Sequence, residues 1–105
     1  MPLISAASVL LQLIHRHGPQ YAGGAVRLAE RRYQTVLGFT AVRDALAKLE
    51  AQGCLHPQRR PTPLGGTARI YYHLTLQGVA RAERQRLEVA RVFRFRRPEA
   101  ATSPP

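Results

Sequence analysis

The stretch "RIYYHLTLQG", Arg69 to Gly78, changes in character halfway along its length. Its first half alternates, with Ile70, Tyr72 and Leu74 on one face, which is the pattern of a half-buried β-strand. Beyond Thr75 the chain becomes rich in alanine and arginine, and threonine is a favoured residue at a helix N-cap. The stretch therefore predicts a junction between a strand and a helix, with Thr75 as the cap of that helix.

A partner strand is predicted just upstream. The segment "CLHPQRR" (54–60) has strand character, but Pro57 lacks a backbone donor and so favours an edge position. The following "PTPLGG" (61–66) predicts an irregular loop. Together these segments predict a hairpin over about residues 54–74, with Arg59 and Arg60 on its outgoing strand and Arg69 on its return.

Three helices are predicted before the hairpin. Residues 5–17 have apolar residues at helical spacing, with Ser5 as N-cap and Gly18-Pro19 as the stop. A turn over "PQYAGG" (19–24) precedes a second, shorter helix over residues 25–33. The third and clearest helix spans about residues 39–52, buries Val42, Leu46 and Leu49, and ends at Gly53.

The order of elements is helix, helix, helix, hairpin, helix. We therefore predict a mainly α fold with a small β-hairpin, a winged helix-turn-helix with an additional C-terminal helix. In this fold the recognition helix, about 39–52, enters the major groove, and the wing, about 54–74, reaches the backbone or the minor groove. We expect one domain over residues 1–97, with its last helix over about 75–95, and a disordered tail over 98–105.

Charge indicates the kind of partner. The chain has 105 residues with 16 Lys+Arg against 6 Asp+Glu, a formal net charge of +10. Such an excess favours an anionic partner, and arginine suits phosphates and guanine edges because its fork is bidentate. Cys54 is the single cysteine, so no internal disulfide can form, and we expect a reduced, cytoplasmic, nucleoid-associated setting. No apolar run approaches the length of a membrane span.

Two segments together resemble a known family. "ALAKLEAQGCL" (Ala45 to Leu55), followed by "RIYYHLTLQG", is similar to the PadR family of transcriptional regulators, with looser similarity to MarR-type winged helices. The similarity covers roughly Val9 to Leu87. It implies a winged helix, double-stranded DNA as partner, and a dimeric repressor whose last helices pair with the partner subunit. The chain departs from the family at Arg43, where an aromatic residue is common.

The predicted DNA contacts lie on three elements. Asp44 either accepts from a cytosine amino group or pairs with Lys48 four residues later, and we favour the pair. The full predicted set is Arg27, Arg31 and Arg32 on the second helix, Thr40, Arg43, Asp44, Ala47 and Lys48 on the third, and Arg59, Arg60 and Arg69 on the wing.

The last helix has two apolar stripes, which is more than one small core needs. One stripe can pack on its own domain and the other on a second copy, so we expect a homodimer. The first stripe is Val79, Ala82, Val89 and Phe93, and the second is Leu76, Ala80, Leu87 and Ala90. We assign the first stripe to the dimer contact.

The function we predict is sequence-specific binding of double-stranded DNA by a homodimeric transcriptional regulator. Two alternatives remain open: a basic winged-helix module that binds RNA or the ribosome, and a winged helix that binds other proteins. We predict no enzyme activity and no cofactor, because no nucleophile, acid–base pair or phosphate-cradling loop is evident. We also predict no metal site, because His56 and His73 can be neighbours across the hairpin but lack a third ligand. The sequence does not identify a small-molecule effector.

Overall fold

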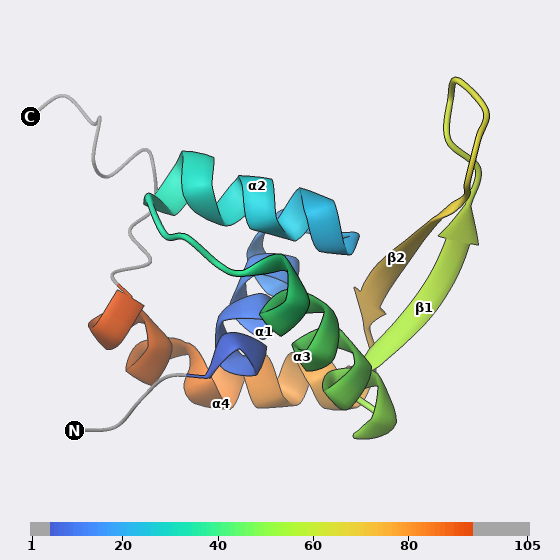
Figure 1. Cartoon of the computed structure of the whole chain (residues 1–105). Coiled ribbons are helices and arrows are strands. Elements are labelled where there is room, and N and C mark those ends of the chain that lie inside the picture. The colour runs from blue at the N-terminus through green and yellow to red at the C-terminus, as the bar shows by residue number, and fades with distance from the viewer. Residues whose placement is uncertain (1–4, 94–105) are drawn as a thin grey trace, which may run out of the picture.

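The computed structural model describes residues 5–93, with side chains as far as residue 90. It contains four helices and a two-stranded antiparallel sheet, as predicted, so the fold class is confirmed (Figure 1). The elements are α1 (Ala6–His17), α2 (Ala22–Tyr33), α3 (Phe39–Ala51), β1 (Leu55–Arg60), β2 (Arg69–Leu74) and α4 (Leu76–Phe93). The predicted tail over 98–105 and the last four residues of the predicted domain, 94–97, lie outside the described residues.

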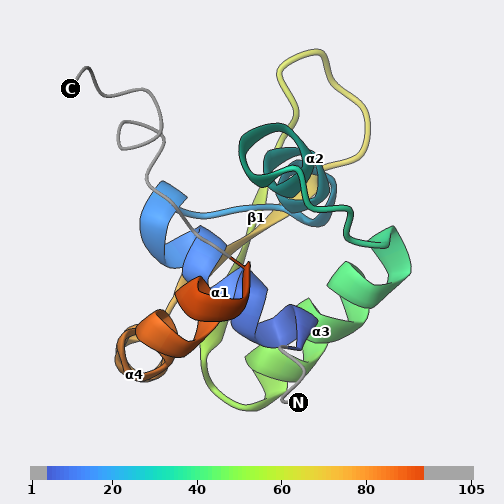
Figure 2. The same ribbon diagram turned by 90° about the vertical axis from the view of Figure 1, so that its left-hand side faces the viewer.

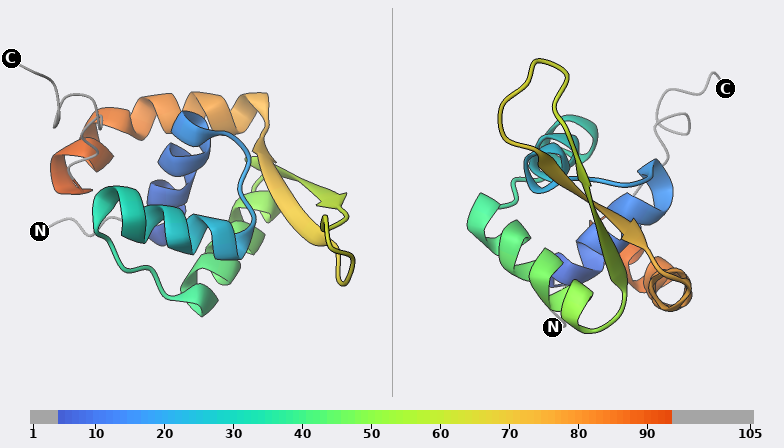
Figure 3. Two further views of the ribbon diagram at one scale, coloured as in Figure 1. Left: turned by 90° about the horizontal axis from the view of Figure 1, so that it is seen from above. Right: turned by 90° about the vertical axis from the view of Figure 1, so that its right-hand side faces the viewer.

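Helix α1 lies in the middle of the molecule. Figures 2 and 3 show it crossing the interior, between α4 on one side and α2 and α3 on the other. Its N-cap is Ser5, whose hydroxyl accepts a hydrogen bond from the Ser8 amide at 3.2 Å, as expected. Because α1 is surrounded, every residue from Val9 to Ile14 is buried. This includes Gln12, whose Nε2 donates to the carbonyl oxygen of Ala82 in α4 at 2.6 Å.

Helix α2 begins at Ala22, three residues earlier than predicted, so "PQYAGG" is not a turn throughout. Gly23 and Gly24 suggested a loop because glycine is a weak helix former. In the structure they lie in the first turn, beside the ring of Tyr21, which is the N-cap residue. A Cβ atom on Gly24 would lie only 2.8 Å from that ring. The need for space next to Tyr21 therefore overrides helix propensity here.

Helix α3 follows the sequence prediction closely. Val42, Leu46 and Leu49 are buried in the core, and the helix ends one residue before the predicted limit of Gln52. Gly53 has a φ of +79°, a left-handed conformation that glycine adopts without steric cost. The chain can therefore reverse directly from α3 into β1.

The hairpin projects away from the helices (Figure 1). In its register Leu55 pairs with Leu74 at the base, and Arg60 pairs with Arg69 at the far end. Tyr72 and Leu74 pack against the core, whereas Ile70, on the same face, is 40% exposed. The predicted alternation therefore holds along β2, but the outer end of the strand extends past the core that would cover it.

The stretch from Arg69 to Gly78 forms the junction between β2 and α4, and it holds the start of α4 in place. Thr75 caps α4 as predicted, because its hydroxyl accepts from the Gly78 amide at 3.0 Å and also donates to the Gly53 carbonyl at 2.6 Å. The Thr75 amide donates to the Cys54 carbonyl at 3.1 Å. Gly78 is buried against that same carbonyl, and a Cβ atom there would overlap its oxygen. The threonine and the glycine thus join the start of α4 to the end of α3.

Candidate nucleic-acid interface

The exposed face of α3 carries the five residues that the sequence predicted. Thr40, Arg43, Asp44, Ala47 and Lys48 all lie at the surface, opposite the buried apolar face of the helix. The favoured ion pair between Asp44 and Lys48 is wrong, since no such pair forms among the described side chains. Both side chains are exposed to water, where an ion pair gains too little to hold two flexible side chains together.

A groove of about 650 Å³ separates α3 from the hairpin. Arg43 and Ala47 line it from α3, Arg69 and Ile70 line it from β2, and the start of α2 closes one end. Phe39, at the first position of α3, is 52% exposed in this groove, and the Arg43 guanidinium lies 5.9 Å from its ring centre. No carboxylate is among the described residues that line the groove, so its charge is wholly positive.

Arginines and tyrosines alternate beside this groove. Tyr21 is central: the Arg69 guanidinium lies 4.4 Å from its ring centre, and the Arg27 guanidinium lies 5.5 Å away and donates to its hydroxyl. The ring of Tyr71 meets Tyr21 edge to face at 5.2 Å, and the Arg60 guanidinium lies 4.5 Å from the centre of Tyr71. We call these five residues the arginine–tyrosine stack. It unites three of the predicted DNA contacts: Arg27, Arg60 and Arg69.

Tyr21 was not among the predicted site residues. The available signal was a tyrosine two residues before a pair of glycines, with an arginine six residues after the tyrosine, but the sequence predicts a turn for this segment. Tyr71 lies on the face of β2 opposite to Tyr72, against the ring of Tyr21.

His73 lies next to Arg60 on the same face of the hairpin. Its Nε2 is 3.2 Å from Nη2 of Arg60 and 2.7 Å from Oε1 of Gln58. Desolvation, followed by the charges of Arg60 and His56, lowers the pKa of His73. His56 and His73 are neighbours across the strands, as predicted, with their tilted rings 6.2 Å apart between centres. Within the described part of the chain, residues 5–93, no three potential ligands are grouped to hold a metal ion.

Three predicted contacts lie apart from the stack. Arg31 is exposed one turn after Arg27. Arg32 is exposed at the end of α2, and desolvation, followed by the charges of Arg32 and Arg16, lowers the pKa of His17 in α1. Arg59 is paired with Ile70 in the hairpin register, so its side chain is on the opposite face from Arg60. Their DNA contacts stay predictions.

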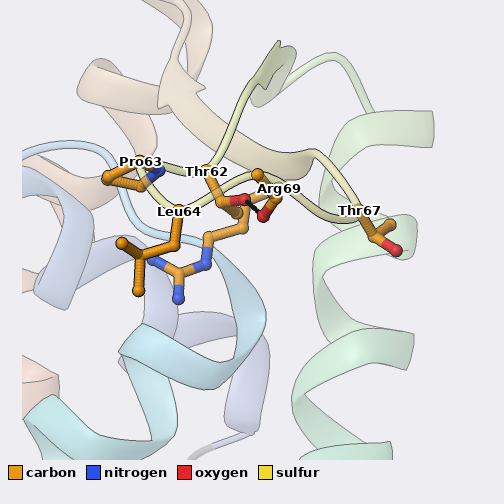
Figure 4. Close-up of a pocket in the computed structure, with 6 residues that line it drawn as sticks. Thr62, Pro63, Leu64, Thr67 and Arg69 are labelled. Carbon is orange, nitrogen blue, oxygen red and sulfur yellow. Dashed lines mark hydrogen bonds between the residues drawn. The ribbon is translucent and has the colours of Figure 1, made fainter.

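The wing tip is a loop with a small recess of about 570 Å³ beneath it (Figure 4). The Thr62 hydroxyl donates to the Gly65 carbonyl within the loop, and Leu64 is fully exposed. Gly65 and Gly66 have positive φ angles, and no strand pairing extends over residues 61–66, in agreement with the predicted irregular loop. The tip is therefore a compact protrusion beyond the two arginines at the end of the strands.

The burial of residues in α4 contradicts the predicted assignment of the dimer contact to the first stripe. Ala82 and Val89 are fully buried in this chain's own core, and Val79 is half-buried, so this stripe is not free to meet a second copy. The side chain of Phe93 lies outside the described ones. The exposed apolar residues belong to the other stripe, where Leu76 is 90% and Leu87 is 69% exposed. The two stripes are equally apolar, so the sequence did not show which of them packs on α1.

Comparison with known proteins defines the fold class. No protein-family sequence profile matches the chain, and no protein of curated function matches it in sequence. Solved structures of PadR-family regulators, however, share its arrangement of helices and hairpin. The chain therefore has a PadR-like winged-helix fold.

Three of these structures illustrate the likeness. A PadR family transcription regulator from Clostridium difficile R20291 superposes with a TM-score of 0.68 at 17% identity, covering 85% of this chain and 91% of that one. A PadR-like transcriptional regulator from Bacillus cereus gives a TM-score of 0.66 at 17% identity, with 82% of each chain covered. The circadian clock associated protein Pex from Anabaena gives 0.68 at 20% identity, covering 85% of this chain and 74% of its own.

Within the described residues no helix is both long enough and apolar enough to cross a membrane.

Proposed function

We propose that this chain is a transcription regulator that binds double-stranded DNA in a sequence-specific manner and acts as a homodimeric repressor. The observation that carries the proposal is the positive groove between α3 and the hairpin, which Arg43 of α3 and Arg69 of β2 line and at whose edge Arg27 of α2 contacts Tyr21. The PadR-like fold supports it, because the solved structures of this fold include proteins described as transcription regulators.

Different arginines have different proposed partners. Arg43 lies in the N-terminal half of α3, the part of a recognition helix that meets base edges in the major groove. Arg27, Arg60 and Arg69 belong to the arginine–tyrosine stack on α2 and the hairpin, away from the base-reading face of α3, where the phosphate backbone is the nearer target. Arg43 should therefore determine sequence preference, whereas the other three should supply affinity that does not depend on sequence.

The proposed dimer contact is the exposed apolar stripe of α4. Leu76, Ala80 and Leu87 lie within about 40° of one another around the helix and are exposed to solvent in the single chain. Covering such a stripe with the same stripe of a second copy removes apolar surface from water in both chains.

The test compares two arginine variants on a preferred and a scrambled duplex. Arg43→Ala should lose about 1–3 kcal/mol on the preferred duplex and little on the scrambled one. Arg60→Ala should weaken both by a similar factor and make the slope of log affinity against log salt shallower by about one. The control is Arg84→Ala, which removes the same charge from the exposed surface of α4. It should leave the affinity for both duplexes unchanged.

Three results would contradict the proposal. Equal losses on both duplexes for Arg43→Ala would show that α3 does not recognise bases through this residue. Preference for structured RNA over duplex DNA in a competition assay would favour the RNA-binding alternative, and binding to neither would favour a protein partner.

A further inference from the structure

We infer that Tyr21 is a positioning residue for DNA binding: its ring holds Arg27 and Arg69 in place before DNA arrives. This inference rests on the proposed function. Tyr21 lines the groove, and we infer that it acts there through the arginines of the arginine–tyrosine stack.

The position of Tyr21 is fixed by its backbone. The preceding residue, Gln20, pairs with Tyr72 of β2, since the Tyr72 amide donates to the Gln20 carbonyl at 2.8 Å. Tyr21 is then the extended N-cap residue of α2, and its carbonyl accepts from the Ala25 amide at 2.9 Å. Tyr21 is therefore attached to the hairpin on one side and to α2 on the other.

The two glycines of α2 leave room for the ring. A Cβ atom at Gly24 would lie 2.8 Å from the ring edge, and one at Gly23 would lie 3.2 Å away. Glycine in a helix is less favourable than alanine, so two adjacent glycines in the first turn are locally unfavourable. The close approach of the Tyr21 ring gives a physical reason for both.

The ring offsets the repulsion between neighbouring guanidinium groups. Arg27 and Arg69 both contact Tyr21, and Arg60 contacts the adjoining Tyr71. The face of an aromatic ring is electronegative and attracts a cation, so the two rings stabilise three like charges in one small area. In a chain without these rings the arginines would separate and move freely in solvent.

Prior ordering of these arginines should raise affinity. A mobile arginine must be immobilised when it binds a phosphate, and this lowers affinity by roughly two- to tenfold for each side chain. The number of phosphates neutralised in the complex stays the same, because the arginines remain charged and within reach. Loss of Tyr21 should therefore weaken binding at every salt concentration and leave the salt slope unchanged, unlike loss of an arginine.

The test uses three variants of the full chain. Tyr21→Leu removes the ring, Gly24→Ala keeps the ring but displaces it, and Tyr21→Phe keeps the ring and removes only the hydroxyl that Arg27 contacts. Circular dichroism establishes that each variant folds. Duplex affinity is measured over a range of salt concentrations, and the ring-current shift of the Arg69 side-chain protons is measured by NMR without DNA.

The expected result is a graded one. Tyr21→Leu and Gly24→Ala should bind about tenfold more weakly with an unchanged salt slope, and Tyr21→Phe should remain within about twofold of the original chain. The Arg69 ring-current shift should be lost in Tyr21→Leu, reduced in Gly24→Ala and kept in Tyr21→Phe. Arg69→Ala, for comparison, should make the slope shallower by about one.

Two failures are distinguishable. Tyr21→Leu with the affinity of the original chain would overturn this inference alone, and so would a slope that changes as much as it does in Arg69→Ala. If the original chain binds no duplex, the proposed function fails and the inference fails with it, whatever the Arg69 shift shows.

Discussion

Substitution of Gly78 by alanine should destabilise the fold much more than its small size suggests. Gly78 is in the first turn of α4, buried against the backbone where α3 meets β1. Its added Cβ atom would overlap the Cys54 carbonyl oxygen and would lie 3.1 Å from the Leu74 side chain. Because a backbone carbonyl cannot rotate aside, the start of α4 must move instead.

The magnitude follows from what that movement disturbs. Overpacking of a filled site costs about 1–3 kcal/mol. The shift also strains hydrogen bonds at the junction, two made by the Thr75 hydroxyl and one by its amide, each worth about 1 kcal/mol. Alanine is favoured over glycine in a helix by up to about 1 kcal/mol, which offsets part of the loss. We expect a net loss of about 2–4 kcal/mol.

The assay is unfolding by urea and by heat, with circular dichroism as the signal. For a domain of this size, a loss of about 3 kcal/mol corresponds to a fall in Tm of about 12–24 °C. Gly38→Ala is the matched control, because φ there is −65° and the nearest atom to an added Cβ is 4.0 Å away. If Gly78→Ala unfolds within about 1 kcal/mol of the original chain, the junction does not depend on this close approach.

Three further predictions concern pH and assembly. The pKa of His17, lowered from its ordinary value of 6.5 by burial and by Arg32 and Arg16, lies below that of the unfolded chain, so stability should fall as pH drops below about 6.5. His17→Gln should flatten this dependence in urea titrations at several pH values. Leu87→Glu should give folded monomers in sedimentation at micromolar concentration, whereas Leu64→Glu, the same change at the wing tip, should leave the dimer intact; a monomeric original chain would contradict the proposed contact.

The fold was predictable because local signals agree with one another. Ser5, Gly53 and Thr75 each end or begin a helix as their chemistry predicts, and the alternation in residues 69–74 identifies the second strand. The agreement of caps, periodicity and turns over most of the chain is what specifies a single structure.

The remaining differences arise where packing at a distance decides the outcome. The first turn of α2 was missed because Gly23 and Gly24 are poor helix formers, and only the ring of Tyr21 explains their presence. Burial of Gln12 depends on the carbonyl of Ala82, which is far along the chain. The stripe of α4 that packs inward depends likewise on α1, because hydrophobicity alone does not distinguish two apolar stripes.

The candidate site was partly predictable. Exposure of Thr40, Arg43 and Lys48 followed from helical periodicity. The arginine–tyrosine stack did not, because it joins residues 21, 27, 60, 69 and 71, and sequence patterns do not show which side chains meet across elements.

Selection of bound duplexes from a random DNA pool tests the central claim most directly. The account predicts enrichment of a sequence with two-fold symmetry, whose half-sites are centred about 10 base pairs apart, or a multiple of that distance, because a symmetric dimer presents two recognition helices. Binding of the selected duplex should weaken with salt at a log–log slope of about −5, for roughly six phosphate contacts per dimer. A pool that shows no enriched sequence, together with a slope near zero, would contradict sequence-specific recognition through α3.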